Sequence, residues 1–385
     1  MLLFSSKLCR FVDMEREIEK AIALIRRGYP KERIIKKISK NFDAEEIYEV
    51  AKCRIKIKDK FSKKELYFDT YGLRYSTPEV IGKYRAERVR DYTIADISCG
   101  VGMQAIFFAR TNRRVLCVDI DKRRIEYAKR NAKTYGIKNM QFICGDCCSN
   151  EIYNIAKRYD IIFSDPARRE EEKERDLRNL LPSPLKIIEK YGKRDYIFDL
   201  PPQISQDKIP KDWEKEYISL NGSIRRLTAY LGSLYRVDRR AVALPSGETL
   251  ESNDDDVFTL ESEFSNYIYI VDEAPYYAHL LGELEKRYKG LWYVSTGKRR
   301  TLASSDNLIK SPFLKPFIVL DYSENLEDII KFLRREKFGK VTLRMKLNPK
   351  EYWKIRGKIE RELSGMDKAS LFHFNGVYVV AKDVT

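Results

Sequence analysis

Four short apolar segments between Ile94 and Arg169 constrain the fold of this chain more than any other feature of its sequence. They read Ile-Ala-Asp-Ile-Ser-Cys-Gly-Val-Gly-Met-Gln, Val-Leu-Cys-Val-Asp-Ile-Asp, Phe-Ile-Cys-Gly-Asp and Asp-Ile-Ile-Phe-Ser-Asp-Pro-Ala-Arg-Arg. The lengths between them suit helices, which predicts strands and helices alternating in an open α/β sheet. Each apolar run ends in polar residues or glycine, where such a sheet binds its ligand.

The first segment also contains a glycine pattern that is typical of dinucleotide-binding proteins. Gly100-x-Gly102-x-x-Ala105 satisfies it, and Asp119 follows at about the distance expected of a ribose-binding acid. Taken alone, this pattern leaves a nicotinamide oxidoreductase open as a hypothesis. The aspartates at the strand ends also have a simpler explanation, because Asp is a common turn residue in any α/β protein.

Three further aspartates extend the pattern: Asp96 before the first glycine, Asp146 after the third strand, and Asp165, followed by proline, after the fourth. Together with the glycines they resemble motifs I to IV of the class I S-adenosylmethionine (SAM) methyltransferases. The resemblance implies a Rossmann-like sheet and SAM as the cofactor. It assigns Asp96 to the amino group of the cofactor, Asp119 to both ribose hydroxyls and Asp146 to the adenine amine. The predicted cofactor-binding residues are Thr77, Asp96, Ser98, Cys99, Gly100, Gly102, Gln104, Asp119, Ile120, Gly145, Asp146 and Cys147.

A Thr-Pro-Glu sequence at residues 77–79 precedes the first motif. Thr77 is suited to cap a helix that has Pro78 at its first position. The same arrangement resembles trimethylguanosine synthase and the methyltransferases that carry a THUMP-like domain, in which this segment folds over the cofactor. The alternating strands and helices after residue 257 resemble the THUMP-like domain of that family. We therefore expect an N-terminal helical domain (1–62), a methyltransferase domain (63–250) and a C-terminal α+β THUMP-like domain (257–385).

Motif IV indicates the acceptor. In amino-methylating relatives an Asn, Asp or Ser precedes Pro-Pro and an aromatic residue, whereas this chain has Ser164-Asp165-Pro166-Ala167 and lacks the aromatic. We predict Ser164, Asp165 and Pro166 as catalytic residues, with Asp165 holding an acceptor amine. The next residues, Arg168 and Arg169, are predicted to bind a phosphate or a carbonyl edge of the substrate, unless they pair with the acids at 170–172.

The charge of the chain predicts a polyanionic partner. Its 74 Lys and Arg residues against 58 Asp and Glu residues give a net charge of +16, and nucleic acid is the commonest partner of such proteins. We predict RNA binding by Lys298, Arg299 and Arg300. Further basic and aromatic residues that could follow an RNA strand are Arg344, Lys346, Lys350, Tyr352, Trp353, Lys354 and Arg356. Trp353 could instead belong to the core, since it shares a helical spacing with Ile355 and Ile359.

The hydropathy of the chain and its cysteines indicate which classes of protein can be excluded. No apolar stretch is long enough for a membrane span and no signal-peptide layout is present, so we expect a cytoplasmic protein. Its seven cysteines look like reduced core residues. Because Cys144-x-x-Cys147 lacks a second pair, we predict no metal site.

The sequence therefore predicts a SAM-dependent RNA methyltransferase. The resemblance implies guanine N2 as the acceptor and tRNA as the substrate. The alternatives are a methyltransferase for another RNA, such as rRNA or capped RNA, and a non-catalytic RNA-binding protein that keeps the fold.

Overall fold

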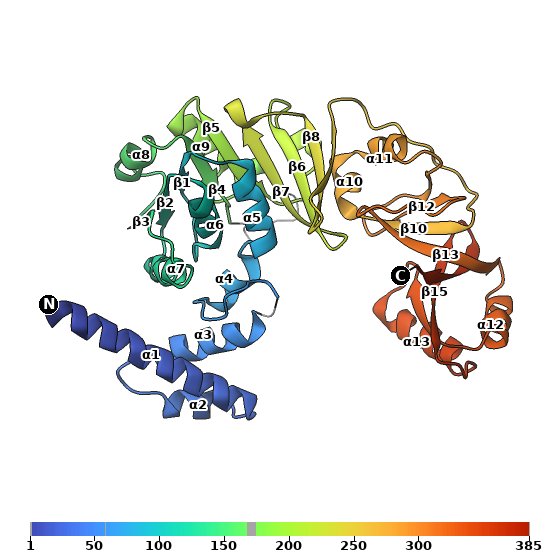
Figure 1. Ribbon diagram of the computed structural model, residues 1–385, viewed down its shortest axis with the longest axis horizontal. Helices are drawn as coiled ribbons and strands as arrows, with labels where there is room; N and C mark the ends of the chain where they lie inside the picture. Colours follow the sequence, from blue (N-terminus) through green and yellow to red (C-terminus); the bar gives the residue numbers. More distant parts are fainter. Residues whose placement is uncertain (1, 58, 168–174, 385) are drawn as a thin grey trace. The chain divides into compact units, whose positions relative to one another are not determined.

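The computed structural model describes residues 2–57, 59–167 and 175–384, which form two compact units (Figure 1). The first unit comprises Met1–Leu200, Ile204–Pro210 and Ala229–Tyr235. The second comprises Pro201–Gln203, Lys211–Thr228 and Arg236–Thr385. The three-domain division expected from the sequence stays a prediction.

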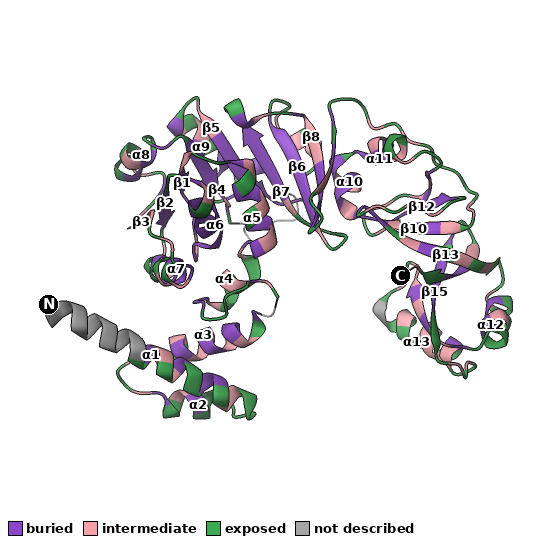
Figure 2. Cartoon of the chain, viewed as in Figure 1, coloured by how far each residue is buried: buried purple, intermediate pink, exposed green. Residues whose placement is uncertain are grey.

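A parallel sheet forms the centre of the first unit. Its strands are β1 (Thr93–Asp96), β2 (Arg114–Asp119), β3 (Met140–Cys144), β4 (Ile161–Ser164) and β5 (Asp195–Leu200). They pair in the order β3-β2-β1-β4-β5, and every pair is parallel. The strand order continues as β7-β6-β8-β9. The strands β1, β2, β4 and β5 are mostly buried (Figure 2), because helices cover the sheet. The edge strand β3 is only partly buried.

Helices connect these strands as the sequence predicts. The connecting helices are α6 (Met103–Thr111), α7 (Lys122–Thr134), α8 (Asn150–Ala156) and α9 (Pro184–Tyr191), and α5 (Glu79–Arg88) precedes β1. Both α6 and α7 pack on β2. The predicted cap of α5 is wrong by one residue, since the helix begins at Glu79 with Pro78 as its N-cap and has no side-chain capping bond. Thr77 is instead buried outside the helix.

The N-terminal helices share a hydrophobic core with the parallel sheet. They are α1 (Leu2–Arg26), α2 (Lys31–Lys37), α3 (Ala44–Lys56) and α4 (Thr70–Tyr75). Asp43 caps α3 and accepts hydrogen bonds from the N–H groups of Glu45 and Glu46. Ile18 and Ile47 belong to the same apolar cluster as residues of β1 and β4.

One buried side chain ties the segment before α4 to the sheet unit. The Oδ1 atom of Asn131 on α7 accepts from the backbone N–H of Tyr67 at 2.7 Å. Its Nδ2 atom donates to the carbonyl oxygens of Tyr67 and Val101, both at 3.0 Å. Asn131 therefore joins three segments that are distant in sequence, one of which is the glycine-rich turn after β1.

Strands after β5 depart in part from the sequence-based expectation. They are β6 (Glu214–Leu220), β7 (Ser223–Leu231), β8 (Arg239–Leu244) and β9 (Glu248–Ser252). From the sequence, residues 223–231 and 236–244 are typical of two antiparallel strands, and no strand is expected at β6. Instead, β8 pairs with β6 in parallel and with β9 in antiparallel fashion.

The rest of the second unit is built on a seven-stranded sheet in the order β11-β12-β10-β13-β16-β15-β14. Its strands are β10 (Tyr267–Val271), β11 (Trp292–Ser295), β12 (Thr301–Ser305), β13 (Leu314–Ser323), β14 (Phe338–Arg344), β15 (Asp367–Phe374) and β16 (Val377–Asp383). Asn375-Gly376, a residue pair typical of hairpin turns, joins β15 to β16. The helices are α10 (Glu273–Ala278), α11 (Leu281–Arg287), α12 (Leu326–Arg335) and α13 (Pro349–Glu360). The sequence of residues 274–288 is typical of a single helix, but His279 adopts a left-handed conformation with φ 54° and interrupts it.

Candidate active site

The carboxyl ends of β1, β2, β3 and β4 carry most of the residues that the sequence singled out. Asp96 ends β1, Asp119 ends β2 and Ser164 ends β4. Asp96 lies opposite Cys117 on one side and Phe163 on the other. Because the strands are parallel and adjacent, these carboxyl ends meet along one edge of the sheet.

The turn after β1 depends on two glycines with positive φ. Gly100 has φ 53° and Gly102 has φ 79°. A Cβ atom at Gly102 would lie 2.8 Å from the Cβ of Ala128 on α7, so only glycine fits there. A Cβ at Gly100 would meet no atom within 4 Å. Gly100 therefore leaves open space beside the backbone, which suits the close approach of a ligand.

Asp119 is fixed by backbone donors on both of its carboxylate oxygens. The N–H of Gly100 donates to Oδ2 at 2.8 Å, and the N–H of Asp121 donates to Oδ1 at 2.9 Å. A carboxylate oxygen has two lone-pair sites, so each oxygen keeps one for a further donor. A pair of adjacent hydroxyls, such as a ribose diol, fits this arrangement.

Asp96 is a buried carboxyl group surrounded by other charges. It is 1% exposed, and its Oδ1 accepts from the N–H of Ser98 at 3.3 Å. Burial raises the pKa of Asp96 well above its usual range, and the neighbouring carboxylates of Asp165 and Asp119 raise it further, whereas Ser98 and Arg85 lower it. A cationic ligand would relieve this repulsion, so the site suits an ammonium group.

Sequence reasoning missed Arg85, which supports the site from α5. Its side chain is fully buried, and its NH1 donates to Oε1 of Gln104 at 2.9 Å. Its NH2 pairs with Oδ2 of Asp199 on β5 at 3.1 Å, and its guanidinium lies 5.5 Å from the ring centre of Phe163. The helical spacing from Ile81 could have revealed it, because residues four apart share a face. Gln104, predicted to bind the cofactor, thus also anchors Arg85.

The loops after β1 and β4 are joined through serine hydroxyls. Ser98 Oγ lies 3.0 Å from Ser164 Oγ and accepts from the N–H of Asp165 at 2.9 Å. Ser164 and Pro166 are buried, whereas Asp165 is half-buried. These bonds bring Asp165 beside the glycine-rich turn. Arg168 and Arg169 lie outside the described residues.

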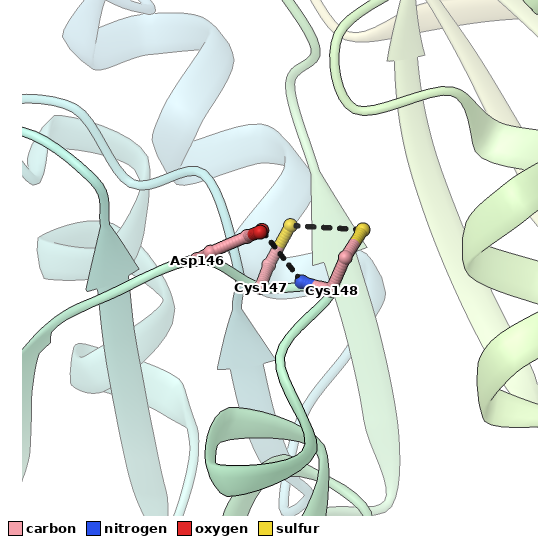
Figure 3. A group of neighbouring side chains, drawn as sticks. All are labelled: Asp146, Cys147 and Cys148. Carbon is pink, nitrogen blue, oxygen red and sulfur yellow. Dashed lines mark hydrogen bonds between the residues drawn. The ribbon is translucent and has the colours of Figure 1, made fainter.

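Asp146, Cys147 and Cys148 form the loop after β3 (Figure 3). Their ligand atoms lie within 4.8 Å of one another, and the two sulfur atoms are 4.0 Å apart. The N–H of Cys148 donates to Asp146 Oδ1 at 2.8 Å, and the hydroxyl of Tyr191 donates to the carbonyl of Cys147 at 2.8 Å. Burial raises the pKa of the Cys147 thiol. The loop therefore has a fixed backbone and a protonated inner thiol.

The remaining predicted residues differ in their surroundings. Ile120 is 76% exposed directly after Asp119, and Cys99 is buried. Gly145 leaves little room, since a Cβ there would lie 3.1 Å from Ile152. Lys298, Arg299 and Arg300 belong to the second unit, before β12.

The cysteines only partly match the expectation of a reduced core. Four of them, Cys53, Cys99, Cys117 and Cys147, are buried with free thiols. Cys144 and Cys148 are exposed, so they are not core residues. Cys144 is the last residue of β3, and Cys148 lies in the loop that follows.

Comparisons with known proteins point to one class of enzyme. Residues 91–202 match a family model described as RNA cap guanine-N2 methyltransferase. A Mycobacterium tuberculosis protein, named as an uncharacterized SAM-dependent methyltransferase, is 25% identical over 260 residues, which is 66% of this chain and 69% of the relative. A Caldanaerobacter subterraneus protein, named as an uncharacterized RNA methyltransferase, is 35% identical over 123 residues, covering 26% of this chain and 27% of the relative.

A solved structure covers nearly the whole chain. A protein from Porphyromonas gingivalis with a provisional methyltransferase name aligns with 96% of this chain and 99% of its own, with a TM-score of 0.72 and 14% identity. This likeness confirms the predicted fold, a Rossmann-like methyltransferase sheet with a second sheet domain. The THUMP-like nature of the C-terminal region stays a prediction. Within the part of the chain that the structure describes, we find no helix with the length and apolar character that a membrane crossing needs.

Proposed function

We propose that this chain, a SAM-dependent methyltransferase by its fold and its relatives, methylates RNA at an exocyclic amine, namely N2 of guanine, with tRNA as the substrate. The observation that carries the proposal is the match of residues 91–202 to the guanine-N2 methyltransferase model. That range contains the glycine-rich turn, Asp119, Asp146 and Asp165. Relatives named as RNA methyltransferases support RNA as the substrate class.

The residues at the sheet edge fit the cofactor. Asp119 keeps a free lone pair on each oxygen for the ribose hydroxyls, and Asp96 offers a buried negative charge to the amino group. The open space beside Gly100 admits the methionine part of the cofactor. When bound, SAM supplies a methyl group activated by its positively charged sulfur.

Asp165 positions the acceptor in this proposal. Its backbone is held by Ser98, and its half-buried carboxylate accepts a hydrogen bond from the acceptor amine. Such a bond would orient the acceptor nitrogen, and the carboxylate would take the proton that the nitrogen loses on methylation. Alignment of this kind is the main contribution that an enzyme can make to such a transfer.

The choice of tRNA depends on the resemblance to methyltransferases with a THUMP-like domain. The net charge of +16 supports a nucleic-acid substrate but does not select one. Alternatives within the same chemistry are rRNA and capped RNA.

The test is a methylation assay on separated RNA classes. Protein is incubated with methyl-labelled SAM and with unmodified tRNA, rRNA or capped RNA, and the digested nucleosides are identified by mass spectrometry. We expect N2-methylguanosine in tRNA with the wild type and a strong reduction with Asp165→Ala. Label on another atom, or only in rRNA or capped RNA, would contradict the finer assignment.

Calorimetry separates the catalytic from the non-catalytic hypothesis. S-adenosylhomocysteine should bind with micromolar affinity if the site holds the cofactor. A folded protein that binds RNA but not this ligand would instead be an RNA-binding protein that has kept the methyltransferase fold.

A further inference from the structure

We propose that the solvent-facing side of α13 in the second unit binds an unpaired base of RNA together with its flanking phosphates. We define this surface, the α13 platform, as Lys350, Trp353, Lys354 and Gly357. The proposal rests on the proposed function only in taking RNA as the substrate. It adds a place where the C-terminal region holds that RNA, far along the sequence from the catalytic motifs.

Trp353 is exposed rather than part of the core. Its exposed fraction is 67%, whereas Ile359 on the opposite face of α13 is fully buried. Tyr352, Ile355 and Leu363 pack with Ile359 in one apolar cluster. The structure thus excludes the core role that the spacing from Ile355 and Ile359 allowed. A large exposed indole is the side chain on which unpaired bases stack most readily.

Gly357 lies four residues after Trp353 and therefore on the same face of the helix. A glycine inside a helix costs about 1 kcal/mol relative to alanine. No packing explains it, because a Cβ atom at this position would meet no atom within 4 Å. The absent side chain leaves the surface beside the indole open, which a ligand lying against the helix would require.

The charge of the platform is positive. Lys350 and Lys354 are exposed, and among the described residues neither makes an ion pair. The guanidinium of Arg356 lies 5.5 Å from the ring centre of Trp353 and is held by Glu360 at 2.9 Å. This contact orients the indole from the side of the helix.

The acidic residues of α13 already have partners. Glu351 closes the capping box with Asn348 at the start of the helix. Glu360 accepts from the N–H of Val341 and from Arg356. The α13 platform therefore presents an exposed aromatic ring beside two lysines, while both acidic residues of α13 already have partners. Such a surface suits single-stranded RNA, which carries negative phosphates and flat bases.

The first experiment compares Trp353→Ala with Trp353→Phe in the full-length protein. Binding of a short fluorescein-labelled single-stranded RNA is followed by fluorescence polarisation without cofactor. We expect Trp353→Ala to weaken the Kd roughly tenfold and Trp353→Phe to keep most of the affinity, because stacking needs only an aromatic face. Tyr322→Ala is the matched control. Tyr322 is also exposed in the second unit, at 62%, but it lies next to the acidic Asp321 rather than between lysines. It should bind like the wild type.

The second experiment uses changes that separate binding from folding. Gly357→Ala should leave the Tm unchanged or raise it, since alanine favours the helix, while RNA affinity falls. The double variant Lys350→Ala, Lys354→Ala should reduce the slope of log Kd against log salt by about one to one and a half, as expected for two phosphate contacts.

Two results would overturn the proposal. Trp353→Ala could bind RNA as tightly as the wild type, or Trp353 could be needed equally for binding anionic phospholipid vesicles. Either result leaves the proposed function untouched, because methylation and S-adenosylhomocysteine binding are measured separately. Conversely, RNA binding through Trp353 in a protein that methylates no RNA would contradict the proposed function alone.

Discussion

Replacing Asp96 with asparagine tests the idea that its negative charge serves a ligand rather than the fold. Asparagine keeps the shape of the side chain and an oxygen that can accept from Ser98. It removes a charge that is 1% exposed and that lies near Asp119 and Asp165. In the protein without ligand, this charge is unfavourable.

The sign follows from the raised pKa of Asp96. A carboxyl whose pKa is higher in the folded than in the unfolded state stabilises the fold at low pH, and this stability is lost as pH rises from the ordinary value of 3.8 through the raised one. At pH values above the raised pKa, each tenfold difference between the acid constants of the unfolded and folded states lowers the free energy of unfolding by about 1.4 kcal/mol. We therefore expect Asp96→Asn to be more stable than the wild type at pH 8, and this difference to shrink as the pH falls toward 3.8.

Ligand binding should change in the opposite direction. A hydrogen bond between two charged groups contributes about 1.5–3 kcal/mol, so the Kd for S-adenosylhomocysteine should rise about tenfold to a hundredfold. Calorimetry at pH 6 and pH 8 measures the affinity, and urea unfolding at the same pH values measures stability. Glu126→Gln, which changes an exposed acid on α7, serves as the control. A variant that is less stable than the wild type at pH 8, or that binds the ligand equally well, would refute the reasoning.

Three further predictions concern the same sheet edge. Asp119→Ala should weaken SAM binding by about 1–3 kcal/mol in calorimetry while RNA binding is retained, and loss of both would indicate unfolding. Asp165→Ala should keep cofactor affinity and lower the single-turnover rate by about a hundredfold, and an undiminished rate would show that this residue is not catalytic. Gly102→Ala should lower the free energy of unfolding by about 1–3 kcal/mol, through its positive φ and its clash with α7, and Gly100→Ala should cost less in the same unfolding assay. Equal losses would show that the close approach to α7 is unimportant.

The strands that carry the site could be predicted because their composition and the residues at their ends both indicate strands of an open sheet. The runs that form β1, β2 and β4 are apolar, and each ends at polar residues that mark the sheet edge. The register and the hydrogen bonds that fix Asp119 could not be predicted, since they depend on the conformation of the turn after β1. The resemblance supplied the roles, and the structure supplies their geometry.

Buried charges explain what sequence reasoning missed. The strand β6 begins Glu-Lys-Glu, which is typical of a surface segment, yet Glu214 and Glu216 are fully buried. Arg240 on β8 lies 3.9 Å from a carboxylate oxygen of each. Arg85 shares a helix face with Ile81, but its ion pair with Asp199 was not predicted because Asp199 is far away in sequence. Charge pairs of this kind become visible only when the fold brings their members together.

The side-chain amide of Asn131 takes the place that a peptide group of a neighbouring strand would have. It satisfies both the N–H and the carbonyl of Tyr67, as a strand partner would, while also holding the carbonyl of Val101. Asn131 thus links the backbone of Tyr67 both to α7 and to the glycine-rich turn. The two regions should open as one cooperative unit. Deuterium exchange at the Tyr67 amide should therefore slow when a ligand binds at the turn.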